Sequence, residues 1–195
     1  RADSGHATVA GLTDPAPRAL AEHVGMLFQG AALFDSLPVW QNVAFRLMRG
    51  TGRMGKPEAK ALAIEKLARV GLDAAVADLF PAELSGGMQK RVGLARAIAG
   101  DPPVLFFDEP TAGLDPIMAS VINRLIRSVV TEMGATALTI THDMTTLREV
   151  ADRVAMLHEG RFHWQGPASE AFTTDDPVLR QFTRGETEGP IPTLR

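Results

Sequence analysis

The chain has 195 residues, of which 45% are hydrophobic and 22% are charged. These proportions are ordinary for a globular domain and exclude a disordered chain, a collagen-like repeat and a coiled coil. No apolar run approaches the roughly 18 residues of a membrane span, and the absence of cysteine excludes a disulfide scaffold, thiol catalysis and cysteine-ligated zinc. A formal net charge of −3 gives no support to nucleic-acid binding driven by positive charge.

The first half of the chain predicts a short strand, a buried strand and three helices. Residues 1–22 are polar and rich in Gly and Pro, so they are expected to be irregular, with a short strand at 7–10. The apolar run Val24–Phe28 predicts a buried strand. Helices are then expected over residues 38–47, 58–70 and 85–99. The last of these has apolar residues at helical spacing, which predicts one buried face made of Met88, Val92, Ala95 and Ile98.

The second half predicts a βαβ unit followed by a hairpin. Val104–Phe107 is a continuous apolar run, typical of a strand that is covered on both faces. A helix over 117–133, ended by Gly134, leads to a β-branched strand over 136–141, and such units build parallel sheets. Beyond them we expect a helix over 144–150, a hairpin with strands at 154–157 and 161–164, and short helices over 167–172 and 178–183.

Polar residues follow both strands of the βαβ unit, where ligands of parallel sheets are bound. Asp108 and Glu109 follow the first strand and His142 follows the second. Asp108 can hold Mg²⁺ through water, and Glu109 can polarise a water for attack on a phosphate. The alternative for the two carboxylates is a solvated acidic turn, which the four apolar residues before them disfavour. For His142 alone, a structural role is the commoner outcome.

The segment Leu84–Gln89, Leu-Ser-Gly-Gly-Met-Gln, stands at a predicted helix start. Its two glycines allow close backbone approach, and free N–H groups at a helix start bind anions. The alternative is that Ser85 merely caps the helix. Asp115, which is followed by Pro116, has the same alternative, since it can be the cap of the helix over 117–133.

Together these segments resemble the ATP-binding-cassette (ABC) ATPase family. Leu84–Gln89 matches its signature motif, the run ending at Asp108-Glu109 matches Walker B, and Gln29, Asp115 and His142 match its other motifs in order and spacing. The resemblance implies an α/β, P-loop NTPase-like core with a mostly parallel sheet and a helical signature subdomain. It implies a partial cassette domain over residues 1–184, with the helical subdomain at about 38–100, and a tail at 185–195.

The resemblance also implies ATP and Mg²⁺ as ligands and a role for each matching residue. Asp108 would support the metal, Glu109 would be the general base, and His142 would sense the γ-phosphate. Gln29 would link metal and attacking water to the transporter contact. Asp115 would communicate across a homodimer. The signature residues would close over the nucleotide that the opposite subunit holds; they are Ser85, Gly86, Gly87 and Gln89. Catalysis of this kind is mainly positioning and electrostatic stabilisation.

The family pattern includes a phosphate loop, G-x-x-x-x-G-K-[ST], ahead of Gln29. Residues 50–56 match it in part, but Pro57 follows where a hydroxyl is needed, and the segment lies after Gln29. We interpret it as a basic surface loop. Since Ala7–Gly11 resembles the strand that follows the Walker A helix, the chain is expected to start just past that helix, at Arg1, with the first strands and the P-loop missing.

Met26–Phe34 and Leu37–Val43 resemble the ATPases of Mce/Mla-type phospholipid transporters, as does the ending from Gln181 to Pro192. This resemblance implies a homodimer on the cytoplasmic face of the cell membrane, bound to a membrane permease, with an Mce lipid-binding protein and a STAS-domain subunit as further partners. No nucleic-acid partner is implied. The tail at 185–195 is expected to contact one of these proteins, the alternative being a disordered end.

Two alternatives to a lipid-transport ATPase remain open at this point. One is a non-catalytic, truncated cassette that only donates its signature motif to a partner, and for the 195-residue chain alone we expect negligible ATP turnover. The other is an importer ATPase for another substrate. A third class, the cassettes of DNA repair, usually carries a long coiled-coil insertion that this sequence lacks.

Overall fold

The computed structural model describes residues 4–49 and 53–192. By its internal contacts the chain divides into two compact units, one ending at Thr141 and the other beginning at His142. The first unit holds a parallel sheet with its helices, and the second holds a β-hairpin with two helices. The predicted division into a domain over 1–184 and a tail remains a prediction.

Three parallel strands form the sheet of the first unit, in the order β3 (Val24–Leu27), β4 (Val104–Asp108) and β5 (Thr136–Ile140). Helix α5 (Pro116–Met133) connects β4 to β5, which confirms the predicted βαβ unit. Its ends follow local rules: the Asp115 carboxylate caps the first turn and Gly134 ends the helix at φ 61°.

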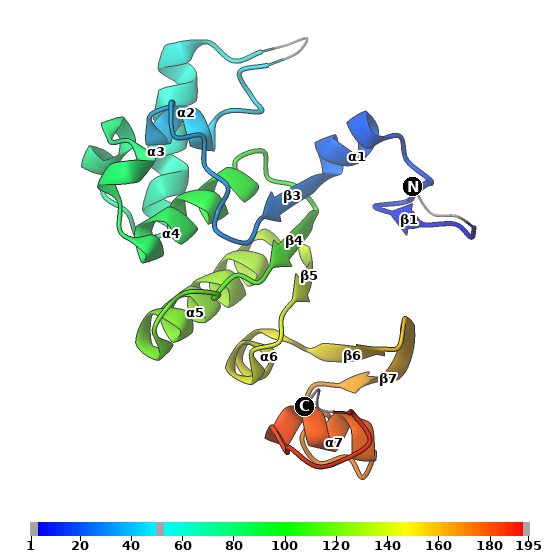
Figure 1. Ribbon diagram of the computed structural model, residues 1–195. Coiled ribbons are helices and arrows are strands. Elements are labelled where there is room, and N and C mark those ends of the chain that lie inside the picture. The colour runs from blue at the N-terminus through cyan, green and yellow to red at the C-terminus, as the bar shows by residue number, and fades with distance from the viewer. Residues whose placement is uncertain (1–3, 50–52, 193–195) are drawn as a thin grey trace. The chain divides into compact units, whose positions relative to one another are not determined.

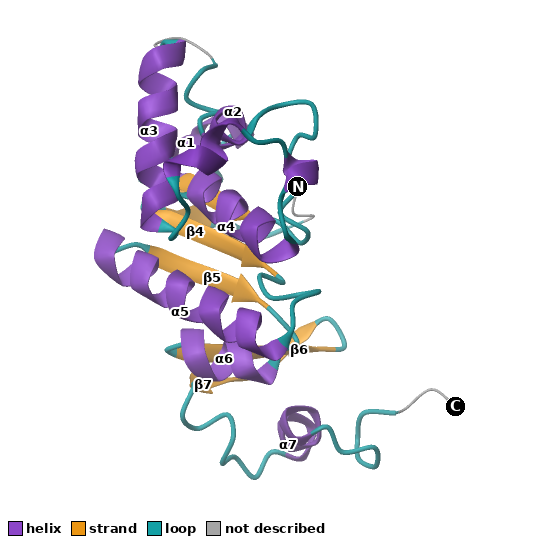
Figure 2. Ribbon diagram, turned by 90° about the vertical axis from the view of Figure 1, so that its left-hand side faces the viewer, coloured by secondary structure: helices purple, strands orange, loops and turns teal. Residues whose placement is uncertain are grey.

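Helix α4 (Gly86–Ala97) lies on the same side of the sheet as α5 (Figures 1 and 2). It contacts β3, α5 and two further helices, α2 (Val39–Val43) and α3 (Lys56–Arg69). Gly25 permits this packing, because a Cβ there would lie 2.0 Å from the carbonyl oxygen of Ala97. The predicted face is buried at Val92, Ala95 and Ile98. Because α4 has neighbours on several sides, residues on its other sides are buried as well.

The two faces of the sheet differ in burial. Leu105 and Phe107 of β4 are 0% and 1% exposed on the face that α4 covers. On the other face Phe106 pairs with Leu138, and Leu138 and Ile140 are 55% and 59% exposed. The predicted coverage of β4 on both faces is thus complete on one face only: side chains alternate between the faces of a strand, and Val104 and Phe106 on the second face are half-buried.

The first unit also contains short elements that the sequence did not predict. Residues 8–9 form a strand as expected, but they pair in a hairpin, β1 (Thr8–Val9) with β2 (Leu12–Thr13). A helix α1 (Pro17–His23) occupies part of the stretch expected to be irregular. Conversely, the helix expected over 38–47 ends at Val43 and continues as turns. Two 3₁₀ helices, η1 (Ala74–Asp78) and η2 (Pro81–Glu83), precede the signature segment.

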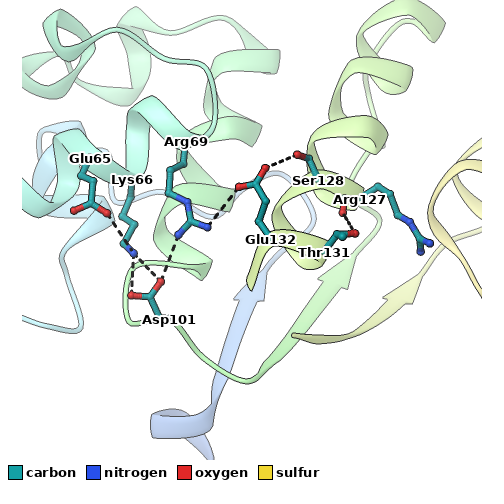
Figure 3. Close-up of polar contacts among 8 residues, drawn as sticks. All are labelled: Glu65, Lys66, Arg69, Asp101, Arg127, Ser128, Thr131 and Glu132. Atoms are coloured by element: carbon teal, nitrogen blue, oxygen red, sulfur yellow. Dashed lines mark hydrogen bonds and ion pairs between the residues drawn. The ribbon is translucent and has the colours of Figure 1, made fainter. Parts of the chain in front are cut away.

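A network of ionic and polar contacts joins α3 to α5 through the loop before β4 (Figure 3). The buried ammonium of Lys66 donates to both carboxylate oxygens of Asp101, at 2.7 and 2.9 Å. Arg69 lies 3.5 Å from Asp101 and 3.7 Å from Glu132 of α5. The helical layer is therefore tied to the segment that leads into β4.

The second unit is built on the predicted hairpin of β6 (Arg153–His158) and β7 (Arg161–Pro167). Glu159 and Gly160 both have positive φ, as a tight hairpin turn requires. Helix α6 (Met144–Val150) precedes the hairpin and α7 (Pro177–Arg184) follows it. The short helix expected over 167–172 is wrong, because β7 extends to Pro167 and turns follow.

The end of the chain is anchored in the second unit up to Ile191. Gln181 is buried and exchanges two hydrogen bonds with the main chain of Ile191, of 3.0 and 2.7 Å. Ile191 also packs against a small core of Met156, Ala171, Val178 and Leu179. A disordered end is therefore wrong for residues 185–192, while 193–195 lie outside the described residues.

Candidate functional site

The carboxylates of Asp108 and Glu109 stand at the carboxyl edge of the sheet. Asp108 is the last residue of β4, opposite Ile140 at the end of β5. Leu27 of β3 pairs with Phe107 of β4, so Gln29 leaves the sheet at the same edge, and its side chain is exposed. The parallel register thus brings together three of the residues that the sequence analysis selected.

Glu109 is held in an unusual conformation, with a left-handed φ of 44°. Its N–H donates to the Ile140 carbonyl at 2.9 Å, and its own carbonyl accepts from the N–H of Ala112 at 3.2 Å. The hydroxyl of Thr141 donates to Glu109 Oε2 at 3.4 Å. A left-handed φ is unfavourable for a residue with a Cβ, so the surrounding hydrogen bonds must stabilise it.

Lys90 of α4 lies near this site, although no sequence motif indicated a role for it. Its side chain is buried, and Nζ donates to the carbonyl of Glu109 at 3.2 Å. Burial lowers the pKa of this ammonium, while the nearby carboxylates of Glu109 and Asp108 act in the opposite direction. The predicted apolar face of α4 left Lys90 on the side expected to meet solvent, so only the packing around the helix identifies it.

The loop that carries Gln29 is fixed by two other side chains, the half-buried Arg96 and the buried Asn42. The Arg96 guanidinium donates to the carbonyls of Ala31 and Ala32 at 2.6 and 2.7 Å, and burial lowers its pKa. The fully buried Asn42 accepts from the N–H of Phe34 at 2.7 Å and donates to three carbonyls of the loop. Gly30, Ala31 and Ala32 all have positive φ. The segment after β3 is therefore a specifically braced turn.

The signature segment lies beside the start of α5. The Ser85 hydroxyl accepts from the N–H of Met88 at 3.3 Å, so Ser85 does cap α4. A Cβ at Gly87 would lie 2.7 Å from Cε of Met118, in the first turn of α5. Asp115 caps that turn by accepting from two N–H groups at 3.0 Å. The capping roles are thus present, and a further role at a nucleotide stays a prediction for both residues.

The remaining residues predicted to contact nucleotide lie at different places in the fold. Gly86 is exposed at the first position of α4. The Gln89 amide donates to the carbonyl of Pro81 at 2.9 Å, within its own chain. His142 is the first residue of the second unit, where Asp143 caps α6. The roles of Gln89 and His142 at a nucleotide remain predictions.

The partial phosphate-loop match at 50–56 behaves as a surface loop where it is described. Residues 50–52 lie outside the described residues, and Lys56 is the first residue of α3. Turns at 44–48 precede the segment, whereas a phosphate loop follows a strand. This arrangement supports rejecting the match.

The oxygen atoms at the sheet edge suit a magnesium ion that takes most of its ligands from water and substrate phosphates. Within residues 4–49 and 53–192, no three His, Cys, Asp or Glu side chains are grouped as a metal site. Asp108 and Gln29 would supply one carboxylate and one amide oxygen. Mg²⁺ keeps several waters and commonly binds through one or two carboxylates plus substrate phosphates, so this sparse oxygen set fits Mg²⁺ arriving with a nucleotide.

The family model described as ABC transporter matches residues 1–112, more than half of the chain. The chain belongs to the ABC transporter family. A solved dimeric ATP-binding cassette in a post-hydrolysis state, bound to ADP and Pi, superimposes with a TM-score of 0.74 at 29% identity, covering 85% of this cassette and 74% of that chain. These matches confirm the ABC ATPase fold expected from the sequence.

The cassette is similar to several curated proteins. It is 44% identical to protein TRIGALACTOSYLDIACYLGLYCEROL 3, chloroplastic, of Arabidopsis thaliana, covering 86% of the cassette and 53% of that protein. It is 41% identical to the probable ribonucleotide transport ATP-binding protein mkl of Mycobacterium tuberculosis, covering 86% and 46%. The intermembrane phospholipid transport system ATP-binding protein MlaF of Escherichia coli is 39% identical, over 88% and 63%. The chain spans about half the length of the first two relatives.

Throughout the described ranges 4–49 and 53–192, no helix combines the length and apolarity that crossing a membrane demands.

Proposed function

We propose that this cassette is the ATP-hydrolysing subunit of a phospholipid transporter of the Mce/Mla type. The observation that carries the proposal is the meeting of Asp108, Glu109 and Gln29 at one edge of a parallel sheet, with Glu109 locked in a left-handed turn. Carboxylates in this position suit a metal-bound nucleotide and an attacking water. Membership of the ABC transporter family supports the same chemistry.

Each site residue then takes a defined part in hydrolysis. Asp108 and Gln29 hold the metal of Mg·ATP, and Glu109 accepts a proton from the attacking water. His142 contacts the terminal phosphate. The signature residues contact the nucleotide that a second, identical subunit holds; these residues are Ser85, Gly86, Gly87 and Gln89. Asp115 communicates between the two subunits of that homodimer.

The lipid substrate is proposed from similarity of sequence. MlaF of Escherichia coli is named for intermembrane phospholipid transport, whereas mkl is named for probable ribonucleotide transport. The segments Met26–Phe34 and Leu37–Val43 resemble the lipid-transport subfamily, and the first of them contains the braced turn after β3. We therefore favour phospholipid over ribonucleotide as the transported molecule.

The same resemblance supplies the proposed assembly. The cassette is a cytoplasmic protein held at the inner face of the membrane by a permease, with an Mce lipid-binding protein and a STAS-domain protein as further partners and no nucleic acid. The domain covers residues 1–184, with its helical subdomain at about 38–100, and the tail at 185–195 contacts one of these partners.

The test is ATP hydrolysis by the full-length subunit, purified with its permease and reconstituted in phospholipid vesicles. Wild type is expected to hydrolyse Mg·ATP, and Glu109→Gln to lower kcat by about 10²- to 10⁴-fold, since a general base contributes that much. Glu159→Gln is the matched control, because Glu159 also has a left-handed φ but lies in the β6–β7 turn. It is expected to leave kcat unchanged.

Two outcomes contradict the proposal. Absence of hydrolysis in the wild-type complex would support the non-catalytic alternative, in which the cassette only donates its signature motif. Hydrolysis that drives uptake of a ribonucleotide, with no transfer of fluorescent phospholipid between vesicles, would retain the ATPase and overturn the lipid substrate.

A further inference from the structure

Helix α4 carries the signature residues and also contacts the main chain of Glu109. Its first turn carries the signature residues, and Lys90 lies one turn further along, where it reaches the main chain of Glu109. At 1.5 Å per residue, about 6 Å of rigid helix separates Gly86 from Lys90. A displacement of the signature end would therefore be passed to Lys90 with little loss.

The contact is directed at the part of Glu109 that needs support. Nζ of Lys90 donates to the carbonyl oxygen of Glu109, the residue whose φ is 44°. The same carbonyl accepts from the N–H of Ala112, so the ammonium completes the second acceptor position of a tight turn. Hydrogen bonds from a charged donor are about twice as strong as neutral ones. Lys90 can thus offset the strain of the left-handed residue.

Burial makes this contact hard to replace. Lys90 is 4% exposed, so water offers little substitute for the carbonyl that it binds. Lys66 is equally buried at 3% exposure, but it pairs with Asp101 in the network of Figure 3, at the other end of β4 from Glu109. The two lysines differ in what they hold, which provides a matched comparison.

We infer that Lys90 is a positioning residue that fixes the main chain of Glu109 in its left-handed turn and ties the signature end of α4 to the catalytic glutamate of the same subunit. The inference rests on the proposed function, because it assigns a purpose to the conformation of Glu109. It adds to that function a physical connection between the motif that meets the partner's nucleotide and the general base of the chain's own site.

The first test measures hydrogen exchange at the turn in the full-length protein without nucleotide. In Lys90→Met the amides of Glu109 and Ala112 are expected to exchange at least tenfold faster than in wild type. In Lys66→Met, which also removes a buried ammonium, those amides are expected to keep their wild-type rates relative to the rest of the sheet. Lys90→Arg, which retains a charged donor, is expected to restore most of the protection.

The second test measures ATP hydrolysis by the same variants in the permease complex. Lys90→Met is expected to lower kcat by about tenfold or more while the KM for ATP changes less than twofold, since a misplaced base affects the chemical step rather than binding. Lys66→Met is expected to affect kcat by less than twofold, and Lys90→Arg to recover activity. A fall in kcat together with a rise in KM, equal in both Met variants, would indicate a purely structural lysine.

The two tests fail in distinguishable ways. A wild-type complex without ATPase activity contradicts the proposed function, yet the exchange measurement still decides whether Lys90 holds the turn. Unchanged exchange at Glu109 and Ala112 in a folded Lys90→Met protein overturns the inference, whatever the activity. If Lys90→Met fails to fold, Lys90→Leu, which also removes the donor and has a shorter apolar side chain, takes its place, and the same result with it is equally decisive.

Discussion

The ammonium of Lys66, on α3, lies 2.7 Å from Oδ1 of Asp101, in the loop that leads into β4. Lys66 is 3% exposed, whereas the Asp101 side chain is 61% exposed, so the pair stands at the edge of the interior. Asp101 has a positive φ of 45° and is followed by two prolines. The pair therefore fixes the start of the strand that ends at Asp108.

We expect Asp101→Asn to destabilise the protein by about 1–2 kcal/mol, because it removes the charge opposite a buried ammonium while Asn still tolerates positive φ. In the Lys66→Met background the same substitution should change the free energy of unfolding by less than about 0.5 kcal/mol. Urea unfolding of the four proteins measures this coupling. Equal effects in both backgrounds would show that the pair contributes nothing.

The left-handed turn after β3 predicts an unusual response to glycine. Ala32 is exposed with a φ of 45°, so Ala32→Gly should stabilise the protein by about 0.5–1 kcal/mol through relief of strain. Ala61→Gly, at an exposed position inside α3, should destabilise it by about as much. Urea midpoints followed through the fluorescence of Trp40, in a Trp164→Phe background, compare the two. Loss of stability in both variants would contradict the strain at Ala32.

Close packing of β3 on α4 predicts that one glycine cannot be replaced. A Cβ at Gly25 would lie 2.0 Å from a main-chain oxygen of α4, which cannot move without shifting the helix. Gly25→Ala is expected to destabilise the protein by about 3 kcal/mol or more, beyond ordinary overpacking. Gly55→Ala, whose Cβ would meet its nearest atom at 4.0 Å, should be neutral within about 0.5 kcal/mol. Thermal unfolding of both variants tests the contrast.

The second unit is expected to lose stability in acid through Asp176. The N–H of Leu179 and the His163 imidazole hold the pKa of this carboxyl below its usual range. A pKa that is lower in the folded state contributes stability above the unfolded value and loses it as the pH falls through the folded pKa. Below about pH 4, unfolding should therefore become easier, and Asp176→Asn should be markedly less sensitive to acid over that range.

This pH dependence is measured by urea unfolding between pH 2 and about 6, with Trp164 of β7 as the probe in a Trp40→Phe background. Asn also caps helices, so α7 should form in both proteins and only the charge differs. Parallel acid transitions in wild type and Asp176→Asn would assign the loss of stability to other carboxylates.

Local rules in the sequence predicted most elements and selected the candidate site residues. Asp115, Pro116 and Gly134 determine the ends of α5 because capping depends on neighbouring residues alone. The apolar run before Asp108 and the β-branched run before Thr141 predicted two parallel strands, because each run is a local signal that needs no distant contact. Where the local signal was weak, prediction failed: Pro17 opens a helix in a stretch expected to be irregular, and Pro167 ends a strand where a helix was expected.

What the sequence by itself determined is the order of the motifs, the parallel βαβ unit and the choice of Asp108, Glu109 and Gln29 as candidate site residues. Tertiary structure decided which surfaces are buried, because burial depends on neighbours that are distant in sequence. Leu138 follows an apolar pattern yet is exposed, whereas Lys90 is charged yet buried against Glu109. A pattern of side chains can predict that a helix forms, but only packing determines which of its faces meets the site.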